Sequence, residues 1–335
     1  MEKHRIYTFG RPDTQGQFAR EPVLRRMADG SLVCLFLTGG PTEPHNDNHV
    51  VISLSLDDGC TWSVPEPLFS HRGRAVWATE LFVPPEGDPF AVVHTYQSEC
   101  FYRELQTFRS FTRDCGRSWS EPASFPNGLN GVSLRQGIVL SNGEWLFPMY
   151  WQETLSGFDW TEGAYSAPFC TGAAISPDRG ASFFRTSCYQ RAELGVWEPN
   201  CVELEPGHLV LLMRCNHQYL RRADSFDYGR SWTENSLTGI PNPSTKFSLV
   251  KVRDAVLLLN NFVAAPGWES RTHLEIRVSR DGLHSFDCCL PLEPSSESWF
   301  YPHACADDSR RILYVAYENA REHRLAKIPY EELGL

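Results

Sequence analysis

The stretch Ser55-Leu-Asp57-Asp-Gly59-Cys-Thr61-Trp62 follows the pattern Ser/Thr-x-Asp-x-Gly-x-Ser/Thr-aromatic, and this pattern recurs along the chain. Its five aspartates, which are 57, 64, 49 and 54 residues apart, are Asp57, Asp114, Asp178, Asp227 and Asp281. In the last copy the glycine stands one place early, at Gly282. A repeat with this spacing indicates five copies of one supersecondary unit.

The residue types in the repeat predict a tight turn between two strands. An aspartate in a turn accepts hydrogen bonds from backbone N–H groups ahead of it, and the following glycine provides a left-handed conformation. The hydroxyl closes the turn, and the aromatic residue begins the next strand and packs inward. We therefore expect these five aspartates to be structural and to have no catalytic role.

Short apolar runs separate the turns, and they predict β-strands because they are rich in Val, Ile, Leu, Phe and Tyr. Examples are residues 31–38, 90–97, 208–215 and 311–319. A period of about 55 residues accommodates four short strands, which is one propeller blade. The 335 residues then form an all-β, six-bladed β-propeller of four-stranded antiparallel blades. We expect one domain over residues 1–335, closed by pairing residues 4–9 with the C-terminal strands.

Composition excludes several classes of protein. The chain has 31 Lys and Arg against 41 Asp and Glu, a net charge of −10, which argues against nucleic acid or an anionic membrane as partner. The 11 cysteines form no C-x-x-C pair, so neither disulfides nor a zinc site are expected. We expect no cofactor and no metal. An apolar span and a secretory signal are both missing, so a cytoplasmic location is expected.

The repeats resemble the Asp boxes, or bacterial neuraminidase repeats, of the six-bladed sialidase-like propellers, and the resemblance covers nearly the whole chain. It implies a retaining exo-glycosidase that releases terminal sialic acid or a related acidic sugar from a glycan. Three arginines clamp the carboxylate of the sugar in that family. By resemblance they are Arg20 in Phe18-Ala-Arg20-Glu21-Pro22, Arg214 in Leu212-Met213-Arg214, and Arg271 in Arg271-Thr-His-Leu-Glu-Ile-Arg277.

The resemblance also implies the nucleophile and its base. Tyr301, in Trp299-Phe300-Tyr301-Pro302-His303, stands where the family has its tyrosine, and Glu198, sixteen residues before Arg214, stands where it has a glutamate. A phenol is a poor nucleophile at neutral pH because its pKa is about 10, so Glu198 would remove its proton. A neutral tyrosine also approaches an anionic sugar without the repulsion that a carboxylate would meet.

The family's acid is an aspartate about 25 residues after the first arginine, and two residues compete for this place. Asp47 lies 27 residues after Arg20 and has the right residue type, whereas Glu43 lies 23 residues after it. The sequence favours Asp47 and leaves Glu43 open. Four further residues are expected to bind substrate from loops at the mouth of the propeller: His45, His49, Trp77 and Arg135.

Two alternatives keep the fold and change the function. The same mouth could serve β-elimination or hydrolysis on another acidic glycan, which release of a 4,5-unsaturated uronate would reveal. The propeller could also bind glycans without turnover.

Overall fold

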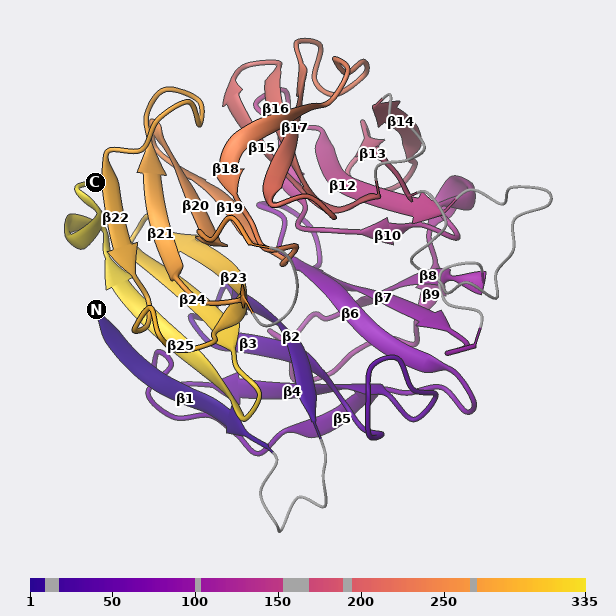
Figure 1. Cartoon of the computed structure of the whole chain (residues 1–335). Helices are drawn as coiled ribbons and strands as arrows, with labels where there is room; N and C mark the ends of the chain where they lie inside the picture. The colour runs from indigo at the N-terminus through magenta and orange to yellow at the C-terminus, as the bar shows by residue number, and fades with distance from the viewer. Residues whose placement is uncertain (10–17, 100–103, 153–168, 189–194, 266–269) are drawn as a thin grey trace.

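Six antiparallel sheets are arranged in a ring around a central axis in the computed structural model, which describes residues 1–9, 18–99, 104–152, 169–188, 195–265 and 270–335 (Figure 1). Five sheets have four strands, and the third sheet along the chain has five. The described residues contain no α-helix, and two of their 3-10 segments are η3 (Pro126–Gly128) and η6 (Tyr330–Leu333). The predicted all-β, six-bladed propeller is confirmed.

Each sheet is a blade whose first strand lies beside the axis, and the strands nearest the axis contact those of the neighbouring blades. Blades 1 to 3 consist of β2 (Ala19–Arg26), β3 (Leu32–Thr38), β4 (His49–Ser55) and β5 (Glu66–Phe69); β6 (Ala75–Phe82), β7 (Phe90–Tyr96), β8 (Gln106–Phe111) and β9 (Ala123–Ser124); and β10 (Ser133–Leu134), β11 (Ile138–Val139), β12 (Trp145–Gln152), β13 (Phe169–Ser176) and β14 (Phe184–Cys188).

Blades 4 to 6 consist of β15 (Val196–Glu205), β16 (His208–Cys215), β17 (Tyr219–Ser225) and β18 (Ser236–Pro241); β19 (Ser248–Val252), β20 (Ala255–Asn261), β21 (Leu274–Ser279) and β22 (Cys288–Pro291); and β23 (Phe300–Asp307), β24 (Ile312–Glu318), β25 (Glu322–Pro329) and β1 (Glu2–Thr8). In blade 3 the inner strand is divided, because β10 and β11 pair with opposite ends of β12.

The two ends of the chain close the ring, as the sequence predicted. Strand β1 pairs with β25, so that the N-terminal segment completes the blade built from the C-terminal strands (Figure 1). Asp58, in the first turn repeat of blade 1, reaches across to blade 6, where it accepts hydrogen bonds from Lys327 Nζ at 2.7 Å and from the Tyr314 hydroxyl at 2.5 Å. The N-terminal strand therefore completes blade 6, and the side chain of Asp58 joins blade 1 to blade 6.

The turn repeats have the predicted hydrogen bonds. The Asp57 carboxylate accepts the Thr61 N–H at 2.8 Å and the Thr61 hydroxyl at 2.6 Å, while Gly59 has φ 86°. These hydrogen bonds from the side chain and backbone of Thr61 lower the pKa of Asp57 to about 2. In the fifth repeat Leu283, with φ 73°, takes the left-handed place that glycine holds elsewhere.

The hydrophobic core consists of layers between adjacent blades rather than one central core. The six largest clusters in the described residues each join two neighbouring blades around the ring. The apolar runs predicted as strands supply these layers; residues 208–215, for example, form β16. No helix among the described residues is long and apolar enough to cross a membrane. The cytoplasmic location stays a prediction.

One end of the ring, which we call the mouth, gathers residues from many strands. The first residues of an inner strand pair with the last residues of the second strand, as Trp197 does with Arg214 and Phe300 with Glu318. The loop between β3 and β4 lies at the same end, because Thr38 pairs with both Ala19 and His49. The turn repeats follow the third strand and lie at the opposite end. The topology alone therefore separates the turn aspartates from the mouth.

Candidate active site at the mouth of the propeller

Three inner strands carry the same local distortion where they enter the mouth. Each has a register shift, and each contains a residue with positive φ followed by proline: Glu21 at 56°, Glu198 at 46° and Tyr301 at 56°. A left-handed conformation is unfavourable for residues other than glycine and is found where the surrounding structure imposes it, often at functional sites. A bulge redirects a side chain. These three side chains therefore occupy equivalent places around the axis.

The three arginines implied by the family resemblance converge beside Tyr301. Arg214 Nε donates to the Ser244 hydroxyl at 3.4 Å, and Arg271 Nη2 donates to the Ser244 carbonyl at 3.1 Å. Arg20 and Arg271 both lie over the ring of Phe300, at 5.6 and 5.3 Å from its centroid. One serine and one aromatic ring thus link all three guanidinium groups, which come from blades 1, 4 and 5.

Buried carboxylates lie beside two of these arginines. Arg214 Nη1 donates to Glu198 Oε2 at 2.6 Å, and Arg20 Nε lies 3.9 Å from Oε1 of Glu318, whose side chain is fully buried. Glu318 was missed in the sequence because it ends an otherwise apolar strand, and a single carboxylate there forms no motif. The hydrogen bond to Glu198 gives the Arg214 guanidinium a fixed orientation, which suits it to bind a planar carboxylate. Arg20 instead donates to the backbone carbonyls of Ala19 and Asn319.

Tyr301 is buried among these charges and is only 4% exposed. The Arg271 guanidinium lies 4.8 Å from the centroid of its ring. Burial raises the pKa of the Tyr301 phenol; Arg271 and Arg214 oppose this effect, while Glu198 and Glu21 add to it. The net effect keeps the phenol neutral at pH 7, so it can react as a nucleophile only if its proton is accepted by another group.

Glu198 is a carboxylate that interacts electrostatically with Tyr301. Burial disfavours its charged form, but Arg214 and Arg135 outweigh burial and lower its pKa to about 2. Glu198 is therefore ionised throughout the physiological range. Because Arg214 holds its charge in place, an anion that bound to Arg214 would weaken this interaction and make Glu198 a stronger base.

The two candidate acids, Asp47 and Glu43, both lie in the loop between β3 and β4 but have different surroundings. The Asp47 side chain is 77% exposed and lies 3.5 Å from Nδ1 of His45. Glu43 is also exposed at the surface, but the protein atoms around it reduce the solvation of its carboxyl group, and this loss of solvation, together with the carboxylates of Glu21 and Glu318, raises its pKa to about 8. Asp47, which the sequence favoured, thus lies on the rim, whereas Glu43 interacts with the carboxylates of the inner strands.

Asn48 shapes this loop. Its side-chain amide donates to the carbonyls of Gly39 and Thr42, and its Oδ1 accepts the N–H of His45 at 2.8 Å. Asn48 is 2% exposed. It therefore anchors both sides of the segment that carries Glu43, and no pattern in the sequence pointed to it.

The other predicted binding residues fall into separate environments. His45 and His49 lie on the rim beside Asp47, whose backbone carbonyl is 3.0 Å from Nδ1 of His49. Trp77 is 6% exposed and packs edge-on against Tyr96 at 4.5 Å. Arg135 is 3% exposed and lies where the inner strand of blade 3 is divided, inside the channel. Of these four, Arg135 joins the charged groups of the inner strands.

Charged groups of both signs gather in the inner part of the mouth. Its cationic groups are Arg20, Arg135, Arg214, Lys246 and Arg271, and its carboxylates are Glu21, Glu43, Glu198 and Glu318. The carboxylate of Asp47 adds a further negative charge on the rim. In the described residues no group of three His, Cys, Asp or Glu side chains is arranged to hold a metal ion. The arrangement suits an anion and acid–base chemistry.

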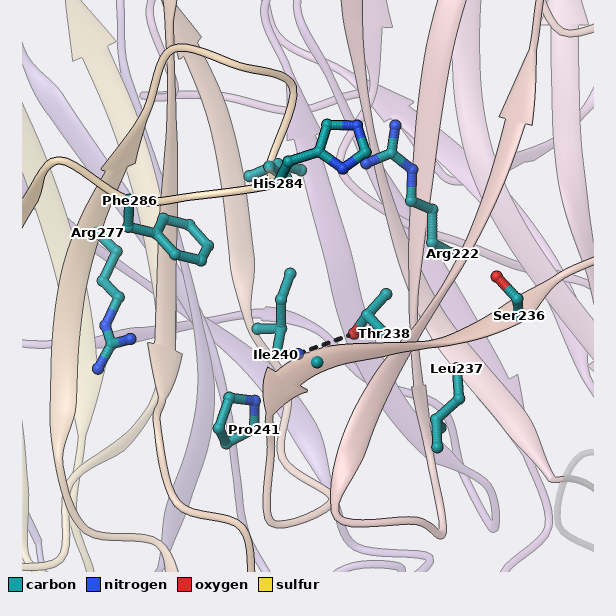
Figure 2. Close-up of a pocket in the computed structure, with 11 residues that line it drawn as sticks. Arg222, Ser236, Leu237, Thr238, Ile240, Pro241, Arg277, His284 and Phe286 are labelled. Atoms are coloured by element: carbon teal, nitrogen blue, oxygen red, sulfur yellow. Dashed lines mark hydrogen bonds between the residues drawn. The ribbon is translucent and has the colours of Figure 1, made fainter.

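A second concavity of about 400 Å³ lies away from the mouth, between the outer strand β18 and strand β21 (Figure 2). Its two arginines have acidic partners. Arg222 contacts Asp224 at 2.7 Å, and Arg277 contacts Glu275 at 3.1 Å. The groove therefore lacks the convergence of charges found at the mouth.

Comparison with known proteins agrees with this geometry. The model of the BNR repeat-like domain family matches residues 18–312. A curated sialidase of Bacteroides fragilis is 24% identical over 278 residues, which are 77% of this chain and 48% of the relative. The chain thus spans about half the length of that relative.

Two solved structures have the same fold. A Hadza microbial sialidase superposes with a TM-score of 0.76 at 17% identity, covering 94% of this chain and 66% of that one. A Dyadobacter fermentans protein of unknown function superposes with a TM-score of 0.76 at 16% identity, covering 97% of both chains. The chain belongs to the family of BNR repeat-like domains and is a sialidase-like six-bladed propeller.

Proposed function

We propose that this propeller is a retaining exo-glycosidase of the sialidase type, which releases terminal sialic acid or a related acidic sugar from a glycan. The observation that carries the proposal is the convergence of Arg20, Arg214 and Arg271 beside the buried phenol of Tyr301. Three guanidinium groups at one place suit a carboxylate attached to the reacting carbon. The similarity to a curated sialidase supports the same reaction class.

The first half of the reaction transfers the sugar to the protein. The Tyr301 oxygen attacks the anomeric carbon while Glu198 accepts the phenol proton. The bond from the anomeric carbon to the aglycone oxygen breaks, and Glu43 donates its proton to that oxygen. Binding of the substrate carboxylate to Arg214 strengthens Glu198 as a base at the moment when a base is needed.

The second half returns the site to its starting state. A water molecule attacks the anomeric carbon and gives a proton to Glu43, the bond to Tyr301 breaks, and the phenolate recovers its proton from Glu198. Two displacements at one carbon retain its configuration. We assign the acid–base role to Glu43 rather than Asp47 because Glu43 interacts with the inner-strand carboxylates and has a raised pKa.

The decisive assay compares aryl α-sialosides with aryl glycosides of uronic and neutral sugars. We expect release of the aryl group from the sialoside, with the α-anomer as the first product seen by NMR. Incubation with a 3-fluorosialosyl fluoride, followed by peptide mass spectrometry, should find the label on Tyr301. A label elsewhere, a β-anomer formed first, or an unsaturated uronate product would contradict the proposal.

A further inference from the structure

Ser244 lies between two of the arginines proposed to bind the substrate carboxylate. It belongs to the segment 242–247, which connects β18 of blade 4 to β19 of blade 5. Its hydroxyl oxygen accepts a hydrogen bond from Arg214 Nε at 3.4 Å, and its backbone carbonyl accepts one from Arg271 Nη2 at 3.1 Å. One residue therefore contacts a guanidinium group from each of two neighbouring blades.

The backbone at Ser244 is left-handed, with φ 52°. This conformation is uncommon for residues other than glycine and persists where the surrounding structure imposes it. A glycine would form the same turn without strain, but it has no hydroxyl group to accept the hydrogen bond from Arg214. The strained backbone thus points to a role for the serine side chain.

Two buried asparagines hold the segment on either side of Ser244. Oδ1 of Asn242 accepts the Thr245 N–H at 2.9 Å, and its amide donates to the Thr245 carbonyl at 3.0 Å. The same amide donates to Oδ1 of Asn260 at 2.7 Å, and the amide of Asn260 donates to the Pro241 carbonyl at 2.7 Å. Asn242 and Asn260 are 1% and 0% exposed. These hydrogen bonds fix the position of Ser244 relative to both blades.

The two arginines carry the same charge and are almost fully buried, with exposed fractions of 7% for Arg214 and 1% for Arg271. Because like charges repel, their guanidinium groups need acceptors that hold them close together. Arg214 is held at two nitrogens, at Nε by Ser244 and at Nη1 by Glu198. The hydroxyl and carbonyl oxygens of Ser244 belong to one residue, so covalent geometry limits the distance between the two arginine donors.

We propose that Ser244 is a positioning residue that fixes Arg214 and Arg271 relative to each other before the substrate binds. It holds Arg214 through its hydroxyl group and Arg271 through its carbonyl group, so that both guanidinium groups can bind one carboxylate. Paired hydrogen bonds between a guanidinium and a carboxylate require a defined orientation of the two planes. This inference rests on the proposed function, in which both arginines bind the carboxylate of the sugar.

The first test compares Ser244→Ala and Ser244→Gly with wild type. Both variants lose the hydroxyl group and keep the carbonyl group. We expect each to raise the Kd of a 2,3-unsaturated sialic acid, which has no glycosidic bond to cleave, by about tenfold in calorimetry, the usual effect of losing one hydrogen bond to a charged group. KM on an aryl α-sialoside should rise by a similar factor while kcat changes little, because the carboxylate is bound throughout the reaction.

The free energy of unfolding separates positioning from a purely structural role. Ser244→Gly should be at least as stable as Ser244→Ala, because glycine adopts a positive φ without strain, and it should still bind the ligand as weakly as Ser244→Ala does. It also serves as the second variant if Ser244→Ala does not fold.

Ser248→Ala is the matched control. Ser248 is a buried serine of β19, four residues further along the chain, and its hydroxyl group forms hydrogen bonds with Gln136 Oε1 and the Ala304 N–H. Its Kd should stay at the wild-type value. Wild-type affinity in Ser244→Gly, or an equal loss of affinity in Ser248→Ala, would overturn the inference.

An NMR measurement provides a readout that needs no substrate. The Nε–H signal of Arg214 is identified by its loss in Arg214→Lys, and it should shift and exchange faster with solvent in both Ser244 variants than in wild type or Ser248→Ala. An unchanged signal would overturn the inference. If the signal responds while wild type neither binds nor cleaves a sialoside, the proposed function fails and the role of Ser244 in holding Arg214 stands. If wild type binds and cleaves the sialoside but the Ser244 variants keep its affinity, the inference about Ser244 fails alone.

Discussion

Replacing Glu43 by alanine should affect the cleavage of natural and aryl substrates very differently. A general acid matters in proportion to the need of the leaving group for a proton. A sugar alcohol needs full protonation as it leaves, whereas a 4-nitrophenol or methylumbelliferone leaves as an anion near neutral pH. We therefore expect Glu43→Ala to slow the first half-reaction on an oligosaccharide and to spare it on an aryl sialoside. Asp47→Ala should affect both substrates equally or neither.

The pKa of Glu43 sets the size of this effect. At pH 7 a carboxyl group with a pKa of about 8 is ~90% protonated, whereas one with the ordinary value of 4.5 is only ~0.3% protonated. The mouth thus provides about 300 times more of the acid form than an unperturbed glutamate would. Loss of the acid should slow cleavage of the oligosaccharide by about 10²–10⁴-fold.

The assay must separate the two half-reactions. Glu43 is also the base for the attack of water, so steady-state rates on both substrates fall in Glu43→Ala and conceal the difference. The burst of aglycone before the steady state reports the first half-reaction alone. In wild type, kcat/KM on the oligosaccharide should decline as pH rises through about 8, because deprotonation of Glu43 removes the acid.

Three outcomes would refute this reasoning. A dependence on the leaving group in Asp47→Ala and not in Glu43→Ala would return the acid role to Asp47. A basic limb that persists unchanged in Glu43→Ala would show that another group titrates there. No dependence in either variant would indicate that the sialidase mechanism is wrong for this propeller.

Three further predictions concern the three arginines proposed to bind the substrate carboxylate, the carboxylate of Glu318 beside one of them, and the packing between the first and last blades. Arg271→Lys should raise KM and lower kcat/KM of the aryl sialoside by about tenfold or more, since an ammonium cannot form two parallel hydrogen bonds to a carboxylate; unchanged kinetics would remove Arg271 from the clamp. Glu318→Gln should raise KM more than it lowers kcat, because it removes the negative charge that lies 3.9 Å from Nε of Arg20. An effect on kcat alone would argue against a binding role for Arg20. Gly59→Ala should lower the free energy of unfolding by about 1 kcal/mol or more beyond the loss in the control variant Gly73→Ala. Both glycines have positive φ, but a Cβ at Gly59 would lie 2.2 Å from Leu325 of blade 6, whereas a Cβ at Gly73 would have no neighbour within 4 Å. Equal losses in the two variants, measured by urea denaturation, would contradict this packing.

The regular part of the fold could be predicted from local patterns. The turn repeats depend on hydrogen bonds within a few residues, such as those from Thr61 to Asp57, and the runs that became β3, β7, β16 and β24 are apolar because both of their faces meet neighbouring blades. Both patterns can be recognised in the sequence without knowing which distant residues they contact. The period of the repeats then sets the number of blades.

The inner strands were not predicted as strands, although they carry the site. β2, β15 and β23 contain Glu21-Pro22, Glu198-Pro199 and Tyr301-Pro302, and proline in a strand argues against a central position in a sheet. These strands lie at the axial edge of their blades, where the proline does not have to donate a hydrogen bond to a neighbouring strand. The bulges that proline permits are what turn the charged side chains into the channel.

Residue types and spacing were sufficient to propose Arg20, Arg214, Arg271, Glu198 and Tyr301 as a set, since the family motifs are short and local. The choice between Glu43 and Asp47 depends instead on how Asn48 anchors the loop between β3 and β4. The contact of Glu318 with Arg20 depends on ring closure, which brings blade 6 beside blade 1. Electrostatic interactions act through space, so they appear only once the blades have closed around a common axis.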